Sequence, residues 1–327
     1  MSVLVTGVAG FIGHAAAKAL LARGEEVVGI DDLNAYYDPA LKRARLADAG
    51  PRLRFHQLDF ADHAALDAAL AGERIDRILH LGAQAGVRWS LENPRAYVRS
   101  NLVGHLNLLE LARARTAPMV YASSSSVYGA NAKHPSAVAD RVDHPVSLYA
   151  ATKRADELMS ETYAHLYRIP LTGLRFFTVY GPWGRPDMAP WLFTDAILAG
   201  RPIRVFNEGR MQRDFTFIDD IVAGVLACLD RPPDDDGAAK PGGSTAPHAL
   251  YNIGNDRPVE LARFVDLIEA ACGRRAIREL APMQPGDVPA TWADIADLER
   301  DHGYRPTTPI EDGIPRFVAW FRSYHGR

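Results

Sequence analysis

Short apolar runs alternate with longer segments of helical periodicity through the first half of the chain. The expected strands are residues 2–6, 26–30, 53–58, 77–81, 119–122 and 171–175, and the expected helices are residues 14–23, 62–70, 94–115 and 149–168. This alternation is typical of a parallel sheet covered by helices on both faces. The pattern therefore predicts an α/β fold with a doubly wound parallel sheet.

The alternation weakens after residue 175, where the loops become longer. Further amphipathic helices are expected at residues 189–199, 218–229, 261–271 and 310–321. We expect residues 1–175 to form a nucleotide-binding domain, to which segments at about 215–230 and 249–256 return. We expect residues 176–327 to form mainly a smaller C-terminal α/β substrate domain.

Composition narrows the class of protein. The 327 residues are 47% hydrophobic and 24% charged, with a net charge of −3, so no basic excess indicates a nucleic-acid partner. The chain begins without a basic segment and holds no apolar run of membrane length, which predicts a cytoplasmic protein without a membrane partner. Cys228 and Cys272 have no partners at metal-ligand spacing, so we expect two reduced core thiols and no metal site.

Three glycines at Gly7, Gly10 and Gly13 follow the first expected strand and open the first expected helix. This context is typical of dinucleotide binding, because glycines allow the tight turn and let the backbone approach a pyrophosphate at the helix N-terminus. An ordinary tight turn is the alternative. The next expected strand ends in Asp31 and Asp32, whose carboxylates would accept hydrogen bonds from ribose hydroxyls and repel a 2′-phosphate. The pattern favours NAD over NADP.

Three other strand ends carry residues suited to a ligand, because parallel sheets bind ligands beyond the carboxyl ends of their strands. We expect Asp59 and Phe60 near the adenine, and the segment 81–84 near the pyrophosphate and the nicotinamide ribose. The third end is the serine run 123–126. Each of these could instead consist of ordinary loop residues.

Tyr149 and Lys153 place a phenol and an ammonium four residues apart, on one face of an expected helix. A tyrosine has an unperturbed pKa of about 10, so its use as a base requires a nearby cation that favours the phenolate. Lysine and an oxidised nicotinamide ring are such cations. The pair alone is a short motif that also arises by chance.

The glycines, Asp31, the serine run and the Tyr149–Lys153 pair together resemble the extended short-chain dehydrogenase/reductase family of nucleotide-sugar enzymes, over essentially the whole chain. Within that family, longer segments are similar to the UDP-glucuronate 4-epimerases, namely residues 34–38, 41–46, 83–88, 121–129, 179–188 and 283–290. The resemblance implies a Rossmann-type fold, NAD as the cofactor and a UDP-sugar as the substrate.

The resemblance also implies roles for single residues. Ser124 and Tyr149 match the family's catalytic Ser/Thr and base, and Lys153 matches the lysine that activates the base. At the UDP end, Val205 and Phe206 resemble the uracil-stacking segment, with Arg213 at the pyrophosphate and Asp287 at the uridine ribose. Phe206 could instead belong to the core. The full set expected at the cofactor is Gly7, Gly10, Phe11, Ile12, Gly13, Asp31, Asp32, Asn34, Asp59, Phe60, Leu81, Ala83, Gln84, Asn101, Tyr149, Lys153 and Phe177.

The reaction implied is epimerisation at C4 of UDP-glucuronate to UDP-galacturonate through a 4-keto sugar, without decarboxylation. Related dehydratases and decarboxylases carry acidic residues after their Ser/Thr, whereas Ser125 and Ser126 are neutral here. With Thr178, these serines are the candidates for holding the uronate carboxylate, and Arg88 and Arg185 are possible cationic partners. Either arginine could instead be a solvated surface charge.

Three other functions stay open at this point. The chain could epimerise a neutral or N-acetylated UDP-hexose, decarboxylate UDP-glucuronate, or bind NAD as a sensor without catalysis. A homodimer is also expected, because the helices at 94–115 and 149–168 carry more apolar positions than one sheet face covers. These positions are Leu102, Leu106, Leu109, Leu158 and Met159.

Overall fold

The computed structural model describes residues 1–283 and 288–326. A seven-stranded sheet forms the centre, with the strand order β10-β6-β5-β4-β1-β2-β3 and parallel pairing throughout. Its strands are β1 (Ser2–Thr6), β2 (Glu26–Asp31), β3 (Leu53–Gln57), β4 (Arg77–His80), β5 (Met119–Ser124), β6 (Leu171–Phe176) and β10 (His248–Ile253). The predicted doubly wound α/β fold is thereby confirmed.

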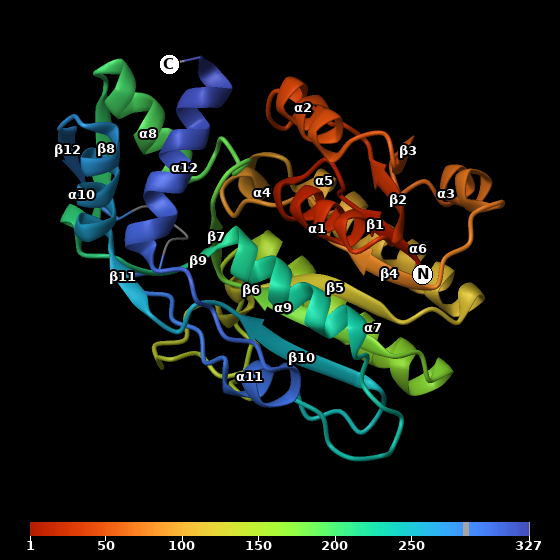
Figure 1. The fold of residues 1–327 in the computed structure, drawn as a ribbon. Coiled ribbons are helices and arrows are strands. Elements are labelled where there is room, and N and C mark those ends of the chain that lie inside the picture. Colours follow the sequence, from red (N-terminus) through yellow and green to blue (C-terminus); the bar gives the residue numbers. More distant parts are fainter. Residues whose placement is uncertain (284–287, 327) are drawn as a thin grey trace.

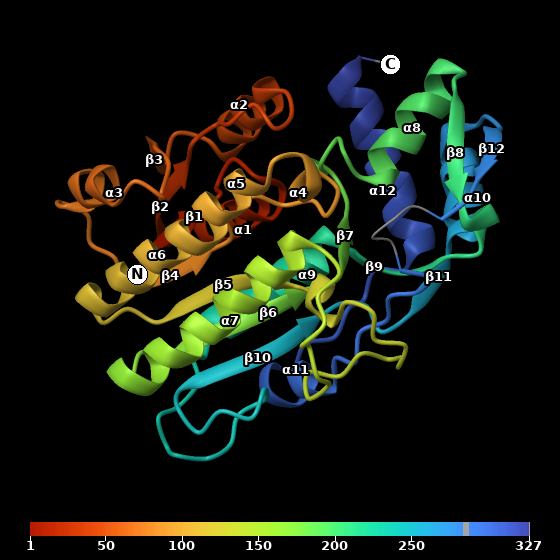
Figure 2. The same ribbon diagram turned by 180° about the vertical axis from the view of Figure 1, so that it is seen from behind.

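Helices cover both faces of this sheet. Figure 1 shows α1 (Phe11–Ala22) and α9 (Ile218–Asp230) in front of the strands, and Figure 2 shows α6 (Gly104–Arg115) and α7 (Leu148–Tyr167) on the opposite face. Val3 and Val5 belong to the core on the first face, and Leu4 between them belongs to the core on the second. Successive residues of a strand point to opposite faces, which explains why β1 is apolar at every central position.

Most remaining elements of this part connect the strands. They are α2 (Pro39–Ala49), α3 (His63–Leu70), α4 (Trp89–Glu92), α5 (Pro94–Tyr97), the π-helix η1 (Val98–Val103) and the 3-10 helix η2 (Ser125–Tyr128). Helix α11 (Ala296–His302) follows all seven strands in the chain and packs against β10.

A smaller group of elements lies beyond the carboxyl ends of the main strands (Figure 1). It contains a three-stranded sheet of the order β11-β9-β7 and a parallel two-stranded sheet, β12-β8. Its strands are β7 (Thr178–Tyr180), β8 (Pro202–Phe206), β9 (Gln212–Phe217), β11 (Pro258–Glu260) and β12 (Ile277–Ala281). Its helices are α8 (Ala189–Ala199), η3 (Asn207–Gly209), α10 (Leu261–Cys272) and α12 (Ile310–His325).

Every predicted strand of the main sheet is present with ends within two residues of the expected ones. β10 lies at the edge of this sheet and α9 packs against α1, although both follow residue 175 in the chain. The division into a nucleotide-binding and a substrate domain stays a prediction.

Two helical segments differ from the expectation. The helix expected at 94–115 is divided into α5, η1 and α6, and the π turn brings Asn101 to the backbone of Gln84. Helix α2 was not predicted, because two of its three buried residues are the charged Lys42 and Arg45, so it lacks an apolar periodicity. The sequence nevertheless contains an N-cap for α2, because the side chain of Asp38 accepts a hydrogen bond from Ala40 N at 2.8 Å.

The expectation about apolar excess on two helices was partly wrong. Leu109 is fully buried in the core of the sheet, whereas Leu106 and Leu158 are 42% and 53% exposed. Cys228 and Cys272 are buried free thiols. Within the described ranges, no helix is long and apolar enough to span a bilayer, and no cluster of His, Cys, Asp and Glu could hold a metal ion.

Candidate active site

A cavity of about 830 Å³ opens at the carboxyl ends of the main strands, between them and the smaller group of elements. Most residues singled out in the sequence line it, although they come from many separate segments. They are Gly7, Gly10, Phe11, Ile12, Gly13, Asp31, Asp32, Asn34, Asp59, Phe60, Leu81, Ala83, Gln84, Arg88, Ser124, Ser125, Ser126, Tyr149, Lys153, Phe177, Thr178, Arg185, Phe206 and Arg213.

Two predicted site residues that the structure describes, Asn101 and Val205, are not part of this lining. Asn101 is buried behind it, where its side chain accepts a hydrogen bond from Gln84 N at 2.9 Å and donates one to Gln84 O at 3.1 Å. The same amide donates to Thr152 Oγ1 on α7 at 2.9 Å. Val205 is a core residue, 3% exposed. Asp287 lies outside the described residues.

The turn between β1 and α1 can be formed only with glycines. A Cβ atom on Gly13 would lie 2.1 Å from Gly7 O, and one on Gly7 would lie 2.7 Å from the Cα of Gly82. Gly7 also has a φ of +67°, which side chains disfavour. The backbone at the N-terminus of α1 is therefore open to the cavity, where its amides and the helix dipole favour an anion.

Asp31 ends β2 at the cavity and is held on two sides. Its Oδ1 accepts a hydrogen bond from Leu33 N at 2.9 Å and lies 3.1 Å from Lys42 Nζ. Both side chains of the ion pair are only 6% exposed. Lys42 was not recognised from the sequence, although it lies in the segment 41–46 that carried the resemblance.

The Tyr149–Lys153 pair begins helix α7. Ser147 is the N-cap, and its side chain accepts a hydrogen bond from Ala150 N at 3.1 Å, so the phenol stands in the first turn and the ammonium one turn later. Lys153 Nζ donates to Asp156 Oδ2 at 2.9 Å, and both side chains are buried. Burial raises the pKa of Asp156 to about 6, although Lys153 opposes this shift.

The serine run follows directly from β5. Ser124 caps the short helix η2, because its Oγ accepts a hydrogen bond from Ser126 N at 3.1 Å. The hydroxyls of Ser124 and Ser126 are also 3.1 Å apart. Ser125 and Ser126 are half-buried at the cavity and bring hydroxyls without charge.

Arg185 does not extend into solvent, because it forms a two-bond ion pair with Asp187. Its Nε lies 3.0 Å from Oδ1 and its Nη2 lies 2.5 Å from Oδ2. Tyr36 donates to the same Oδ2 at 3.1 Å. Burial alone would lower the pKa of Arg185, but the charge and the hydrogen bonds of Asp187 raise it. Arg185 therefore stays charged at the cavity, whose lining also includes Tyr149.

Arg45 links the glycine turn to the segment that carries Arg185. Its side chain is fully buried and donates to Ala9 O in the glycine turn at 3.0 Å. It also donates to Trp183 O at 2.7 Å and to Gly184 O at 3.1 Å, next to Arg185. A planar guanidinium presents five N–H donors in a rigid fork, so it suits several carbonyls better than the compact ammonium of a lysine.

The opposite end of the cavity holds the residues expected to contact the uridine diphosphate. The guanidinium of Arg88 lies 5.5 Å from the ring centroid of Phe206, so this arginine is placed at the expected uracil end. Arg213 Nη1 donates to Gln212 O at 2.8 Å. Phe206 is half-buried, so part of its ring is available at the cavity.

Several residues of the site were missed in the sequence because they act through partners. Lys42, Arg45, Tyr36 and Asp187 all lie in segments that resembled the epimerases, yet nothing in the one-dimensional pattern pairs them with Asp31, the glycine turn or Arg185. The one available signal was the presence of Lys42 and Arg45 in a helix that lacks apolar periodicity.

Comparisons with known proteins agree with this geometry. Residues 3–254 match the model of the NAD dependent epimerase/dehydratase family. The chain is 50% identical to a probable UDP-glucuronate 4-epimerase of Rhizobium meliloti, with 100% of this chain and 98% of the relative covered. It is 47% identical to UDP-glucuronate 4-epimerase 1 of Arabidopsis thaliana, with 100% and 78% covered.

Among solved structures, the UDP-glucuronic acid 4-epimerase of Bacillus cereus, crystallised with UDP-glucuronic acid and NAD, superposes with a TM-score of 0.87. It is 31% identical to this chain, and the match covers 99% of this chain and 100% of that one. These findings confirm the resemblance to the extended short-chain dehydrogenase/reductases. The chain belongs to the NAD dependent epimerase/dehydratase family.

Proposed function

We propose that this protein interconverts UDP-glucuronate and UDP-galacturonate by epimerisation at C4, with NAD as a tightly held cofactor. The observation that carries the proposal is the single cavity in which Ser124, Tyr149 and Lys153 meet the glycine turn and Asp31. Full-length relatives at about half identity carry the same activity in their names.

The residues at the first end of the cavity fit NAD. The glycine turn brings backbone amides and the N-terminus of α1 to the cavity, and Asp31 and Asp32 offer carboxylates at the end of β2. When bound, NAD would take a hydride from C4 of the sugar and return it, so that the sugar passes through a 4-keto form. No second substrate is needed for such a cycle.

Proton transfer at the sugar 4-hydroxyl is assigned to Ser124 and Tyr149. A serine hydroxyl can accept and donate a hydrogen bond at the same time, so Ser124 can pass the proton from the sugar toward the phenol. Lys153 lies on the same face of α7 as Tyr149, where its charge favours the phenolate. Asp156 fixes the lysine from behind.

The carboxylate of the sugar has to be held without promoting its loss. A 4-keto uronate is a β-keto acid and releases carbon dioxide readily, so an acidic residue next to Ser124 would be harmful. Ser125, Ser126 and Thr178 offer neutral hydroxyls at the cavity. Of the two arginines, Arg185 is the better partner for the carboxylate, because Arg88 lies over Phe206, at the end of the cavity expected for the uracil.

Product analysis tests the proposal and separates its alternatives. The purified protein, given UDP-glucuronate and no added cofactor, should form UDP-galacturonate reversibly with little carbon dioxide. UDP-xylose or a 4-keto pentose as the main product would make the protein a decarboxylase. Turnover of UDP-glucose or UDP-N-acetylglucosamine alone would make it a neutral-sugar epimerase, and no turnover of any sugar would leave a sensor.

A homodimer is proposed for the assembly. Large apolar side chains remain exposed on the outer face formed by η1, α6 and α7, which lie side by side in Figure 2. Val103 is 44% exposed, Leu106 42%, Leu158 53% and Leu166 61%. Two copies could bury this face as a four-helix bundle. A strictly monomeric mass at micromolar concentration would refute the dimer.

The cytoplasmic location and the division into two domains stay predictions.

A further inference from the structure

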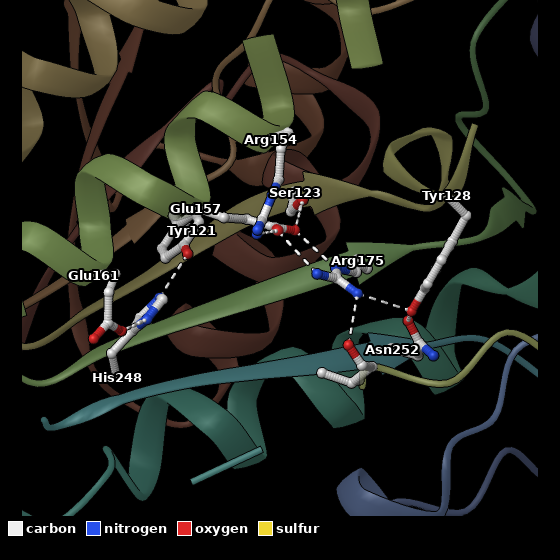
Figure 3. A network of polar contacts seen from close by, with 10 residues as sticks. Tyr121, Ser123, Tyr128, Arg154, Glu157, Glu161, Arg175, His248 and Asn252 are labelled. Atoms are coloured by element: carbon white, nitrogen blue, oxygen red, sulfur yellow. Dashed lines mark hydrogen bonds and ion pairs between the residues drawn. The ribbon is translucent and has the colours of Figure 1, made fainter. Parts of the chain in front are cut away.

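A network of polar contacts lies behind the proposed proton-transfer residues, and Figure 3 shows that Glu157 stands at its centre. Glu157 follows Tyr149 by eight residues and Lys153 by four, so all three share one face of α7. Its side chain is 1% exposed. The helix face that carries the phenol and the ammonium therefore also carries a buried carboxylate.

Three side chains hold this carboxylate. Arg175 on β6 binds it with two hydrogen bonds, from Nε to Oε1 at 2.8 Å and from Nη2 to Oε2 at 2.9 Å. Ser123 Oγ on β5 donates to Oε1 at 2.6 Å, and Arg154 Nη1 donates to Oε2 at 2.9 Å. Burial alone would raise the pKa of Glu157, but the hydrogen bonds and charge of Arg175 lower it. The carboxylate is therefore charged.

The network continues from Arg175 to η2 and β10. Arg175 Nη1 lies 3.1 Å from the hydroxyl of Tyr128 in η2, and that hydroxyl donates to Asn252 Oδ1 on β10 at 2.6 Å. Figure 3 shows these residues in one continuous line from α7 across the strands. The helix and the sheet are thus joined by charge-assisted bonds at the level of the serine run.

The bond from Ser123 is the informative one, because Ser123 directly precedes Ser124. Ser124 comes from the end of β5 and Tyr149 comes from the start of α7, so nothing in the backbone of either element sets the distance between the two hydroxyls. Proton transfer needs donor and acceptor within about 2.6–3.2 Å. The hydrogen bond from Ser123 to Glu157 joins β5 to α7 one residue away from Ser124.

We propose that Glu157 is a positioning residue, which through Ser123 holds the Ser124 hydroxyl at the distance from Tyr149 that proton transfer requires. This inference rests on the proposed function, since it assumes that the two hydroxyls exchange a proton at the sugar. Arg175 anchors the carboxylate, and Glu157 itself touches neither the sugar nor the cofactor.

Ser123→Ala tests the proposal with the smallest change, because it removes the bond to Glu157 and leaves the Arg175 pair in place. We expect kcat to fall about 10-fold to 100-fold, the scale of a misplacement of about 1 Å, while KM changes less than about 3-fold. The NAD content and the melting temperature should stay near those of the unchanged protein. Ser123→Thr keeps the hydroxyl and should restore most of kcat.

Arg154→Met is the matched control. Arg154 also binds Glu157, but from α7 itself and with 28% of its side chain exposed, so it does not tie the helix to a strand. Its kcat should stay within about 2-fold. Glu157→Gln breaks a buried ion pair and could unfold the protein, so its NAD content and melting curve are measured beside its kcat.

The results of these experiments distinguish a failure of the positioning role from a failure of the proposed epimerase function. A Ser123→Ala protein with an unchanged kcat, or an Arg154→Met protein that loses as much as Ser123→Ala, would overturn the positioning role while the epimerase function stands. Failure of Ser123→Thr to recover kcat above that of Ser123→Ala would also overturn it. A wild-type protein that turns over no UDP-uronate would overturn the proposed function, and this inference with it.

Discussion

Lys42 Nζ lies 3.1 Å from Asp31 Oδ1, in an ion pair whose two side chains are each 6% exposed. The carboxylate at the end of β2 is therefore held by a cation from the following helix, and Lys42 also lies 3.7 Å from Asp32 Oδ1. The preference for NAD over NADP therefore depends on the opposing charges of Asp31 and Lys42. The acid repels a 2′-phosphate, and the lysine behind it would attract one.

Asp31→Asn should weaken the discrimination against NADP. The amide keeps the size of the side chain but removes its charge, so Lys42 would be left without its main counter-ion. We expect the ratio of NAD to NADP affinity to fall by about 10-fold or more, because a hydrogen bond to a charged group contributes about 1.5–3 kcal/mol. Fluorescence titration of nucleotide-free protein measures both affinities. Asp32→Asn, at a more exposed carboxylate, is the control and should change the ratio less.

Tyr149→Phe should abolish most turnover and leave the cofactor in place. The phenol is assigned to proton transfer, which contributes about 100-fold to 10,000-fold in rate. NAD released from the denatured variant should equal that from the unchanged protein. Tyr163 lies on the same helix but outside the cavity, so Tyr163→Phe serves as the control with kcat retained. Near-normal kcat in Tyr149→Phe would remove the tyrosine from the mechanism.

Arg185→Gln should separate uronates from neutral sugars. If its charge meets the carboxylate, KM for UDP-glucuronate should rise about 10-fold to 100-fold, while KM for UDP-glucose changes little. Initial rates with both substrates give the comparison. Arg201→Gln is a suitable control, because Arg201 is exposed and pairs with Asp195 away from the cavity. Equal losses for both sugars would assign Arg185 to the structure of the loop.

Arg45→Lys should affect both ends of the site at once. A lysine keeps the charge but lacks the wide fork of donors, so it should lose part of the bonds to Ala9 O, Trp183 O and Gly184 O. We expect lower NAD retention, a higher KM for UDP-glucuronate and a loss of about 2–4 kcal/mol in the free energy of unfolding. Urea denaturation and nucleotide release measure these quantities. Arg43 is the exposed neighbour on α2, and Arg43→Lys should change none of them.

Acid should lower the free energy of unfolding of the protein, because His14 is buried in its neutral form. Burial lowers the pKa of His14 to about 4 from 6.5, in spite of the hydrogen bond with Asp48. The unfolded chain therefore binds the proton first, so this stability is present above pH 6.5 and is lost as the pH falls toward 4. The loss should reach about 3 kcal/mol.

Urea denaturation at several pH values checks this prediction. His14→Gln should show a smaller drop in stability between pH 7 and pH 4 than the unchanged protein does. His165→Gln, at an exposed histidine of α7, should keep the full drop. A His14→Gln protein with an unaltered pH dependence would contradict the assignment to this side chain.

Much of the fold could be predicted from the sequence, because its signals are local. The apolar runs, the glycines before α1 and the spacing of Tyr149 and Lys153 lie within a few residues of one another, and each is tied to a strand, a turn or a helix face by backbone geometry alone. The expected strand ends then placed Asp31, Gln84 and Ser124 at one edge, since parallel strands share the direction of their carboxyl ends.

Only the tertiary structure decided which polar groups meet. Arg45 binds Trp183 O across 138 residues, Arg175 binds Glu157 across 18, and Tyr36 donates to Asp187 across 151. Such partners leave no periodic trace, because a buried ion pair depends on the packing of elements that are distant in the chain. The residue types and the positions of the main strands along the chain were thus determined by the sequence alone. The order of the strands in the sheet and the electrostatic setting of the site were decided by the tertiary structure, in which α2, α7 and the segment after β7 pack against the sheet.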